Sequence, residues 1–427
     1  MNYRAVLHAR NLFFFLLYLT ALALAAVLVY ETLLLTRQVP SPFSSGGAVM
    51  ADPTSTAPAL MGSTAVSANP PTPVPTVPLL ELSLPAEQQF GYHPKTGRYI
   101  AAWLPPSFSG GARESFEANK DILDEISPFW YSTDGSGKLY GTRDDELVRI
   151  AHENNVLVIP TIHNVGDYEA VIDMLSDPQR RTNHIQHIMD EVLARNYDGI
   201  DIDYESLDPG LREEFSAFII DLADALHSHN KMLTVAVHAK DSDYGGLGGY
   251  QDWVVMGKYV DRLRIMTYDY HWRGSGPGPV APLYWIQSVA EYAQTVVDPS
   301  KIVIGVPFYG YDWPESGGPA RALPWGDIED LIAEQGLTVD LRQRDDRGLI
   351  QESRLFYETE AGRREVWFMT DQSLASKLDL VQEMDLAGIA IWQLGYEKPE
   401  YWDVIRSQLV EDPVQIQREI NQWLPEH

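Results

Sequence analysis

The chain of 427 residues contains no cysteine, so it has neither disulfide bonds nor a thiolate for catalysis or metal binding. Positive charge is also scarce, because 32 basic residues stand against 60 acidic ones and the net charge is -28. A chain of this charge repels polyanions, which argues against nucleic acid as a partner and favours a neutral or cationic substrate. Its 45% hydrophobic and 11% aromatic residues exclude a wholly disordered protein and indicate a globular core.

The first 37 residues contain a long hydrophobic run. Residues 12–30 are all apolar apart from Tyr and one Thr, and a run of this length crosses a bilayer as a helix. Arg4 and Arg10 precede the run, which predicts a cytoplasmic N-terminus with the rest of the chain outside. We therefore expect a single-pass membrane anchor at residues 1–37. The alternative is a cleaved signal peptide, with the small residues 21–26 near its cleavage site and a secreted mature protein.

A segment rich in Pro, Ser, Thr, Ala and Gly follows at residues 38–87. Its stiffest part is the Pro-Pro-Thr-Pro-Val-Pro sequence of residues 70–75. Such a composition buries no core and is typical of an extended, semi-rigid linker. The prediction is a tether that holds the next domain, residues 88–411, away from the membrane, with a short tail at residues 412–427.

Residues 88–411 alternate short β-branched runs with helical segments such as 144–154 and 211–229. Short apolar runs are typical of parallel strands that are buried on both faces. Eight such units favour a (β/α)8 TIM barrel, whose functional residues lie at the carboxyl ends of the strands, over the alternative of a doubly wound open sheet. The candidate strands are residues 99–104, 125–131, 156–162, 199–205, 233–239, 262–268, 301–309 and 388–394.

The longest gap between candidate strands, residues 315–369, separates the seventh strand from the eighth. A gap of this size is too long for a single loop in a folded domain. We therefore expect a small inserted subdomain that flanks the cleft of the barrel.

Carboxylates alternate with Ile, Ile and Tyr along the fourth candidate strand. Successive side chains of a strand point to opposite faces, so Asp201, Asp203 and Glu205 share one face. Neighbours two apart on a strand lie about 7 Å from each other, and each carboxylate disfavours ionisation of the next. At least one is expected to stay protonated near neutral pH and to serve as a proton donor. Asp198 lies near the strand's start with opposite parity, and we expect it to have a supporting role.

Two other interpretations of this acidic segment are weaker. A solvated acidic strand would not carry Ile, Ile and Tyr on its opposite face. A calcium-binding loop is the second alternative, but Ser206 stands where that loop needs glycine and Arg212 where it needs its closing glutamate. No histidine pair falls on one helical face beside a third ligand, so we expect neither a metal nor a cofactor. Four further polar residues lie at predicted strand ends, where the sequence fixes no role for them: His163, Asn164, His238 and His271.

Three motifs in chain order resemble those of glycoside hydrolase family 18, the chitinase-like barrels, over residues 88–410. The family carries Asp-x-x-Asp-x-Asp-x-Glu on its fourth strand, Met-x-Tyr-Asp at the end of its sixth and an aromatic residue on its eighth. The third strand differs, because Thr-Ile-His-Asn at residues 161–164 replaces the Ser-x-Gly-Gly of many chitinases. The matching residues here are Asp198, Asp201, Asp203 and Glu205, then Met266, Tyr268 and Asp269, and finally Trp392.

The resemblance implies retaining, substrate-assisted hydrolysis of β-1,4-linked N-acetylglucosamine (GlcNAc) glycans. Glu205 would be the general acid, Asp203 would stabilise the acetamido group of the substrate, and Asp201 would orient Asp203 or share its proton. The implied substrate-binding residues are Met266, Tyr268, Asp269 and Trp392. Packing in the barrel core is the alternative role for the three of them that carry no charge.

Within the family, residues 364–368 and 392–395 resemble the bacterial spore-germination and cortex-lytic branch, which acts on peptidoglycan glycan. The chain differs from many members of that branch in having the predicted anchor and linker in place of an N-terminal LysM-type module. We therefore expect a monomeric enzyme, held outside a bacterial cell membrane, that acts on peptidoglycan or chitin-type glycan. A catalytically silent carbohydrate-binding protein on the same barrel is the alternative, and the intact Glu205 favours the enzyme.

Overall fold

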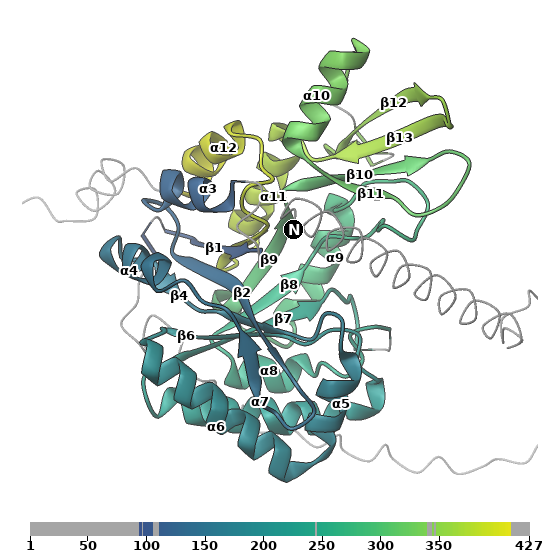
Figure 1. The fold of residues 1–427 in the computed structure, drawn as a ribbon. Coiled ribbons are helices and arrows are strands. Elements are labelled where there is room, and N and C mark those ends of the chain that lie inside the picture. The colour runs from purple at the N-terminus through teal and green to yellow at the C-terminus, as the bar shows by residue number, and fades with distance from the viewer. Residues whose placement is uncertain are drawn as a thin grey trace, which may run out of the picture. The chain divides into compact units, whose positions relative to one another are not determined.

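Eight parallel strands close into a barrel at the centre of the fold (Figure 1). The structure is a computed structural model and describes residues 94, 95, 97–105, 111–243, 246–339, 344, 345 and 347–410. Around the barrel the strand order is β1-β2-β5-β6-β7-β8-β9-β14, and β14 pairs with β1 to close it. The closed barrel predicted from the sequence is therefore confirmed, and the open sheet is excluded.

The barrel strands begin and end close to their predicted boundaries. They are β1 (Tyr99–Leu104), β2 (Glu125–Thr133), β5 (Thr161–His163), β6 (Gly199–Asp203), β7 (Met232–His238), β8 (Arg262–Met266), β9 (Ile302–Pro307) and β14 (Gly388–Trp392). Two short strands extend the sheet beside β2. They are the antiparallel β3 (Leu139–Gly141) and the parallel β4 (Leu157–Val158).

Two predicted strands differ from the observed ones. The third, residues 156–162, is divided into β4 and β5, because Pro160 between them has no N–H to donate to a neighbouring strand. The prediction that Glu205 lies within the fourth strand is wrong. β6 ends at Asp203, which pairs with His163, the last residue of β5. The chain after Asp203 therefore leaves the sheet, and Glu205 lies beyond the strand end.

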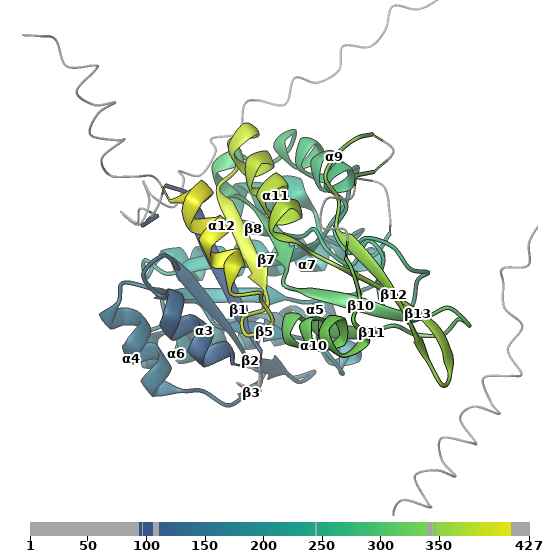
Figure 2. The same cartoon turned by 90° about the horizontal axis from the view of Figure 1, so that it is seen from above.

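Helices pack around the outside of the barrel (Figures 1 and 2). Helix α7 shows why they do so, because its buried residues Phe215, Phe218, Ile219 and Leu222 recur every three or four positions and form one apolar stripe. The outer helices are α3 (Ala112–Asn119), α4 (Asp145–Glu153), α5 (Tyr168–Ser176), α6 (Pro178–Arg195), α7 (Arg212–His227), α8 (Trp253–Tyr259), α9 (Leu283–Gln294), α11 (Asp371–Glu383) and α12 (Glu400–Leu409).

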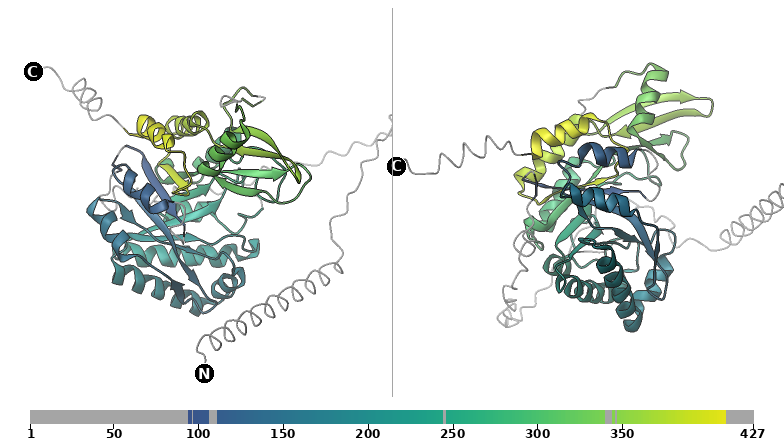
Figure 3. Two further views of the ribbon diagram at one scale, coloured as in Figure 1. Left: turned by 45° about the horizontal axis from the view of Figure 1, so that its top comes forward. Right: turned by 60° about the vertical axis from the view of Figure 1, so that its left-hand side comes forward.

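The predicted insertion is a separate antiparallel sheet that projects from one side of the barrel (Figure 3). Its strand order is β11-β10-β13-β12. It begins at residue 309, earlier than the predicted 315, because the chain re-enters a strand directly after β9. Its elements are β10 (Tyr309–Pro314), β11 (Arg321–Pro324), α10 (Trp325–Gln335), β12 (Ser353–Thr359) and β13 (Gly362–Phe368).

The insertion has its own small core and a polar attachment to the barrel. Leu323, Ile328 and Val366 are among the buried residues of that core. The attachment is the buried carboxylate of Glu352, which accepts hydrogen bonds from the backbone N–H groups of residues 280 and 281 at 2.6 and 3.0 Å. Lys377 Nζ of α11 lies 3.5 Å from the same carboxylate. One buried side chain thus fixes the insertion to the loop after β8 and to an outer helix.

The predicted anchor, linker and C-terminal tail lie outside the described residues. Within the described part of the chain, no helix has the length and apolar character needed to cross a membrane. The membrane anchor at residues 12–30 therefore stays a prediction.

Candidate active site

A cavity of about 290 Å³ lies at the carboxyl ends of the barrel strands. The residues around it lie on or just after strands that are far apart in the sequence, among them β1, β2, β6, β7, β8, β10 and β14. Six of those predicted from the sequence line it: Asp203, Glu205, Met266, Tyr268, Asp269 and Trp392. Aromatic side chains make most of its remaining wall, among them Trp103, Phe129, Tyr309, Tyr311 and Tyr396. A few carboxylates within aromatic walls suit a ligand that has both polar and apolar faces.

Asp201 lies beneath the cavity, fully buried in the barrel interior. Its Oδ2 accepts hydrogen bonds from Trp103 Nε1 and Thr161 Oγ1, both at 2.9 Å, and its Oδ1 accepts one from Thr234 Oγ1 at 2.6 Å. Arg264 Nη1 is 3.4 Å from the same Oδ1. Burial raises the pKa of Asp201, and the three hydrogen bonds partly offset that rise. Both oxygens of Asp201 are thus held in place from four strands of the barrel.

Asp203, the last residue of β6, has one carboxyl oxygen without a partner. Its Oδ1 makes no hydrogen bond to any described part of the chain, although the residue is only 4% exposed. Burial raises its pKa well above the usual range, and the charges of Glu205 and Asp201 raise it further. A buried polar oxygen that faces a cavity without a partner is a group that a bound ligand can satisfy.

Glu205 lies two residues beyond the end of β6, at the edge of the cavity. Burial raises the pKa of Glu205 to about 7, and the negative charge of Asp269 contributes to the rise. The sequence predicted that at least one carboxyl group of the row would stay protonated near neutral pH because of its neighbours on one strand. Those neighbours do raise the pKa of Asp203, whereas the charged neighbour that raises the pKa of Glu205 is Asp269, which follows a different strand, β8. A carboxyl group that titrates near pH 7 is suited to donating a proton.

Asp269 is held toward the cavity by two residues of the insertion. Tyr309 Oη donates a hydrogen bond to its Oδ1, and Tyr311 Oη lies 3.2 Å from its Oδ2. Burial of the carboxyl group raises the pKa of Asp269, and the tyrosine hydroxyls lower it. Neither tyrosine was predicted as a site residue. The alternation of Tyr309, Tyr311 and Trp313 in the sequence was the available signal, because it indicates a strand with an aromatic face.

Trp392 forms an aromatic floor at the end of β14. Its ring packs edge-on against Phe129 and Trp103, with centroid separations of 5.0 and 6.0 Å. Tyr268 stands beside Tyr309 in a similar edge-on contact at 6.3 Å. Glycine is required beneath Tyr268, because a Cβ at Gly305 would come within 2.7 Å of the Tyr268 ring. The rings are therefore fixed by packing, and their exposed faces line the cavity.

A second cavity, of about 670 Å³, adjoins the first. The two share four lining residues, which are Glu205, Met266, Tyr268 and Asp269. The second extends past His238 and Leu247 to Trp272, whose side chain is largely exposed. Glu205 thus lies where two binding spaces adjoin, with room for a ligand to continue on both sides of it.

The remaining predicted residues lie apart from the first cavity. Asp198 is at the opposite end of β6, where its Oδ2 accepts a hydrogen bond from Val158 N at 2.8 Å and lies 2.9 Å from His152 Nε2. Its expected supporting role is therefore at the far end of the barrel. His163 stacks on Phe129, with ring centroids 5.2 Å apart, and His271 lies 2.9 Å from the carbonyl oxygen of Pro279.

Asn164 and His238, whose roles the sequence left open, both contact the backbone around Glu205. Among the described residues no group of three or more His, Cys, Asp or Glu side chains is arranged to hold a metal ion.

A closed (β/α)8 barrel with paired carboxylates and aromatic walls at the carboxyl ends of its strands is the architecture of a glycosidase. Comparison with known proteins agrees with this class. The model of glycosyl hydrolases family 18 matches residues 126–397, and the chain belongs to that family. The resemblance found in the sequence motifs is thereby confirmed.

The relatives include proteins of Bacillus. The sporulation-specific glycosylase YdhD of Bacillus subtilis is 35% identical over 323 residues, which cover 70% of this chain and 73% of YdhD. The cortical fragment-lytic enzyme of Bacillus subtilis is 26% identical over 329 residues, covering 74% of this chain and 75% of that enzyme. The crystal structure of the spore cortex-lytic enzyme SleL from Bacillus megaterium QM B1551 has a TM-score of 0.66 and 25% identity, over 73% of this chain and 74% of that one. With the family, these relatives show that the chain is a glycosidase.

Proposed function

We propose that the protein is a retaining glycosidase that cleaves β-1,4-linked GlcNAc glycans, with Glu205 as the general acid and the substrate's own acetamido group as the nucleophile. One arrangement carries the proposal. Glu205, whose pKa is raised to about 7, lies at the junction of two cavities, and Asp203, whose Oδ1 has no partner among the described residues, lines the smaller one. A glycan bound across both cavities would place one glycosidic oxygen beside the carboxyl group of Glu205.

The first chemical step follows from these positions. Glu205 gives its proton to the glycosidic oxygen as the bond between that oxygen and the anomeric carbon breaks. The acetamido oxygen attacks the same carbon and forms an oxazolinium ion, while the leaving sugar departs with the proton. Asp203 Oδ1 accepts the acetamido N–H. The positive charge that develops on the ring favours the ionised form of Asp203, and that form in turn stabilises the charge. Asp201, itself fixed by three hydrogen bonds, would orient Asp203 or share its proton.

The second step returns the enzyme to its starting state. Water attacks the anomeric carbon and opens the oxazolinium ring, and the Glu205 carboxylate takes the proton that the water releases. Two inversions at one carbon give overall retention. The reacting sugar would lie on Trp392 in the smaller cavity, with Tyr268 near its acetamido oxygen, and the leaving sugars would extend along the larger cavity toward Trp272.

We propose that the natural glycan is peptidoglycan, because the cortical fragment-lytic enzyme of Bacillus subtilis is among the relatives. The match covers 75% of that enzyme. A location outside the cytoplasmic membrane of a bacterium, through the hydrophobic run at residues 12–30, accords with that substrate. Incubation of the barrel domain, residues 88–411, with purified peptidoglycan and with chitooligosaccharides tests whether peptidoglycan is the substrate. The masses of the products identify the bond that is cut. Cleavage of chitooligosaccharides alone would reject peptidoglycan as the substrate.

The mechanism is tested with a GlcNAc glycoside and the matching glucoside, which carry the same leaving group. Only the first has an acetamido group, so we expect the glucoside to react at least about 100-fold more slowly. A thiazoline analogue of the cyclised intermediate should inhibit, because a site complementary to the transition state also binds its mimics. Equal rates on the two glycosides, together with no inhibition by the thiazoline, would show that the acetamido group takes no part.

A further inference from the structure

The three residues that follow β6 have backbone groups that the sheet does not satisfy. β6 ends at Asp203, so the peptide groups of Tyr204, Glu205 and Ser206 lie outside the ladder. Backbone groups that leave a sheet in this way need partners from elsewhere. Each of the three residues finds one in a side chain that comes from another part of the barrel.

Asn164 binds both peptide groups that flank the Cα atom of Glu205. Its Oδ1 accepts a hydrogen bond from Glu205 N at 2.8 Å, and its Nδ2 donates one to Glu205 O at 2.9 Å. Asn164 directly follows β5 and is only 3% exposed. A single side-chain amide thus fixes both ends of the residue that carries the acid, in a two-point contact that resists rotation as well as displacement.

His238, the last residue of β7, holds the next peptide group along the chain. Its Nε2 accepts a hydrogen bond from Ser206 N at 3.2 Å, which requires that this nitrogen carry no proton. Burial lowers the pKa of His238 to about 4, so the ring is neutral at the pH where the enzyme would act. Ser206 has a φ of 55°, in the left-handed region that non-glycine residues seldom occupy. Such a conformation persists where the surroundings fix it.

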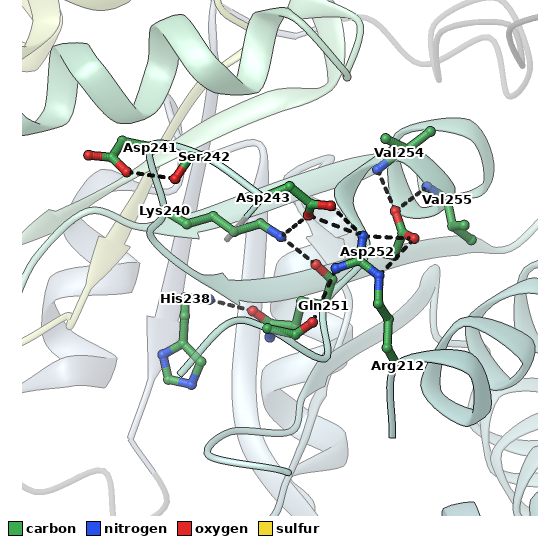
Figure 4. Close-up of polar contacts among 11 residues, drawn as sticks. Arg212, His238, Lys240, Asp241, Ser242, Asp243, Gln251, Asp252, Val254 and Val255 are labelled. Atoms are coloured by element: carbon green, nitrogen blue, oxygen red, sulfur yellow. Dashed lines mark hydrogen bonds and ion pairs between the residues drawn. The ribbon is translucent and has the colours of Figure 1, made fainter. Parts of the chain in front are cut away.

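His238 is itself held by Gln251 (Figure 4), and a chain of hydrogen bonds continues from Gln251 to the backbone of Tyr204. His238 N donates to Gln251 Oε1 at 2.8 Å, and Gln251 Nε2 lies 3.1 Å from Tyr250 Oη. Tyr250 Oη in turn donates to Tyr204 O at 2.5 Å. The backbone on both sides of Glu205 is therefore tied to one buried group of side chains.

This group is itself supported by charge (Figure 4). Lys240 Nζ donates to the carbonyl oxygen of Gln251 at 2.7 Å and lies 3.2 Å from Asp243 Oδ1. Arg212 Nη2 bridges Asp243 at 3.0 Å and Asp252 at 2.9 Å. Asp252 also accepts hydrogen bonds from the first turn of α8. Gln251 is thus fixed to a helix start on one side and to His238 on the other.

We propose that Asn164 and His238 are positioning residues for the general acid, which they hold through the peptide groups of Glu205 and Ser206. The inference rests on the proposed function, because it assumes that Glu205 is the proton donor. Neither side chain has to touch the substrate for this role. A carboxyl group beyond a strand end has no sheet to set its direction, and these two contacts replace that restraint.

The test uses two aryl glycosides of a GlcNAc disaccharide. A phenyl leaving group departs only with a proton from the acid, whereas a dinitrophenyl group departs without one. Asn164→Ala should lower kcat on the phenyl glycoside by about 10-fold to 100-fold, because a small displacement of a catalytic group has a cost of this order. The dinitrophenyl kcat should change by less than about threefold, and KM should stay similar for both, because substrate binding is unaffected.

His238 offers a pair of variants that separates its acceptor from its ring. His238→Phe keeps a ring without an acceptor, and we expect it to lower the phenyl rate selectively, by a smaller factor than Asn164→Ala. His238→Gln retains an acceptor and should recover part of that loss. Asn119→Ala is the matched control. Asn119 is also buried and also donates to a backbone carbonyl, that of Ser115 at 3.0 Å, but it lies in α3. Its loss should reduce stability and leave the ratio of the two rates unchanged.

Glu205→Gln, measured beside these variants, separates this inference from the proposed function. If Glu205→Gln depresses the phenyl rate selectively and Asn164→Ala does not, the positioning role is overturned and the acid is retained. If Glu205→Gln leaves the ratio of rates unchanged, the proposed function falls, and the inference falls with it. Should Asn164→Ala fail to fold by circular dichroism, the His238→Phe and His238→Gln pair decides. A selective loss of the phenyl-glycoside rate in His238→Phe, with partial recovery in His238→Gln, supports the proposal. Equal phenyl-glycoside rates in the two variants overturn it.

Discussion

Asp201 of the barrel and Asp312 of the inserted sheet are both completely buried, in opposite surroundings. Asp201 in the barrel accepts hydrogen bonds from neutral donors, and the guanidinium nearest to it, that of Arg264, is shared with Glu125. Asp312 in the insertion instead accepts two hydrogen bonds from Arg364 Nε, at 2.8 and 3.0 Å, and a third from Tyr357. The insertion neutralises its buried charge with a cation in direct contact.

The difference separates a group kept for chemistry from one kept for structure. A buried carboxylate that is paired with a guanidinium is left uncompensated when the guanidinium is removed, so such a pair is a structural contact of the fold. A row of carboxyl groups with raised pKa values reduces stability at neutral pH, and such groups are typical of sites that transfer protons. We therefore expect substitutions at the barrel carboxyl groups to affect mainly catalysis, and substitutions around Asp312 to affect mainly stability.

The largest effect is expected for Glu205→Gln, which removes the proton donor of the barrel. Turnover on a poor leaving group should fall by about 100-fold to 10,000-fold, because that is the usual contribution of a general acid. The thermal unfolding midpoint should be unchanged or higher. Asp198→Asn is the control at the opposite end of the same strand, and it should affect the unfolding midpoint rather than turnover. Near-normal turnover of a folded Glu205→Gln enzyme would contradict the assignment.

Asp203→Asn should lower activity and raise stability together. We expect turnover to fall by about 100-fold, because the charge that stabilises the cationic intermediate is lost. The pKa of Asp203 is raised in the folded protein, so the wild type loses stability as pH rises through the unfolded value of that pKa toward the folded one. Asparagine removes this loss. Urea unfolding at pH 5 and pH 8 should therefore show a stability gain that is larger at pH 8. A stability gain that is smaller at pH 8 than at pH 5 would show that the pKa of Asp203 is not raised in the folded protein.

Arg364→Met should show the opposite pattern in the insertion. It removes a charged hydrogen-bonding partner from the buried Asp312, and the free energy of unfolding should fall by about 2 kcal/mol. Arg363→Met is the matched control on the neighbouring residue. The Arg363 side chain is 44% exposed and its ion pair with Glu315 spans 3.4 Å, so its loss should cost less than about 1 kcal/mol. Turnover per folded molecule should change little in either variant. Equal losses of stability would remove the distinction between the two arginines.

The smallest effect concerns the point where the two regions meet. Glu205 must carry its proton to act, so kcat/KM should fall as pH rises through about 7. Tyr311→Phe removes a hydrogen bond from Asp269, which makes Asp269 easier to protonate and weakens its effect on Glu205. The basic limb of the pH profile should then move to lower pH by less than about one unit. Tyr357→Phe removes a hydroxyl that donates to Asp312 instead, and it should leave the basic limb of the pH profile unchanged. A shift toward higher pH in Tyr311→Phe would contradict this coupling.

Much of the fold follows from local pattern. Eight short apolar runs separated by helices predicted the barrel, and the gap before the last run predicted the insertion. The end of β6 was not predictable in the same way. Ile202 and Tyr204 continue the alternation past Asp203, but β5 stops at His163 and leaves nothing for the next residues to pair with. Strand ends depend on the neighbouring strand, and that information lies about 40 residues away in the sequence.

The acidic row and the three motifs placed Asp203, Glu205, Tyr268 and Trp392 in the same cavity. The groups that shift the pKa values of these residues or fix their positions were harder to find. Asp269 acts on Glu205 across the cavity, and the tyrosines that hold Asp269 come from the insertion. Asn164 acts on backbone groups, for which a sequence gives no signal.

The attachment of the insertion through Glu352 has a consequence for how the protein unfolds. The amides that Glu352 binds, those of Val280 and Ala281, belong to the loop that follows Asp269 and Trp272. The inserted sheet is therefore not a removable module, because its release would free the loop that borders both cavities. We expect these two amide hydrogens to exchange with deuterated solvent as slowly as those of the barrel strands. The sheet and the barrel would then open in one cooperative transition, and catalysis would be lost in that same transition.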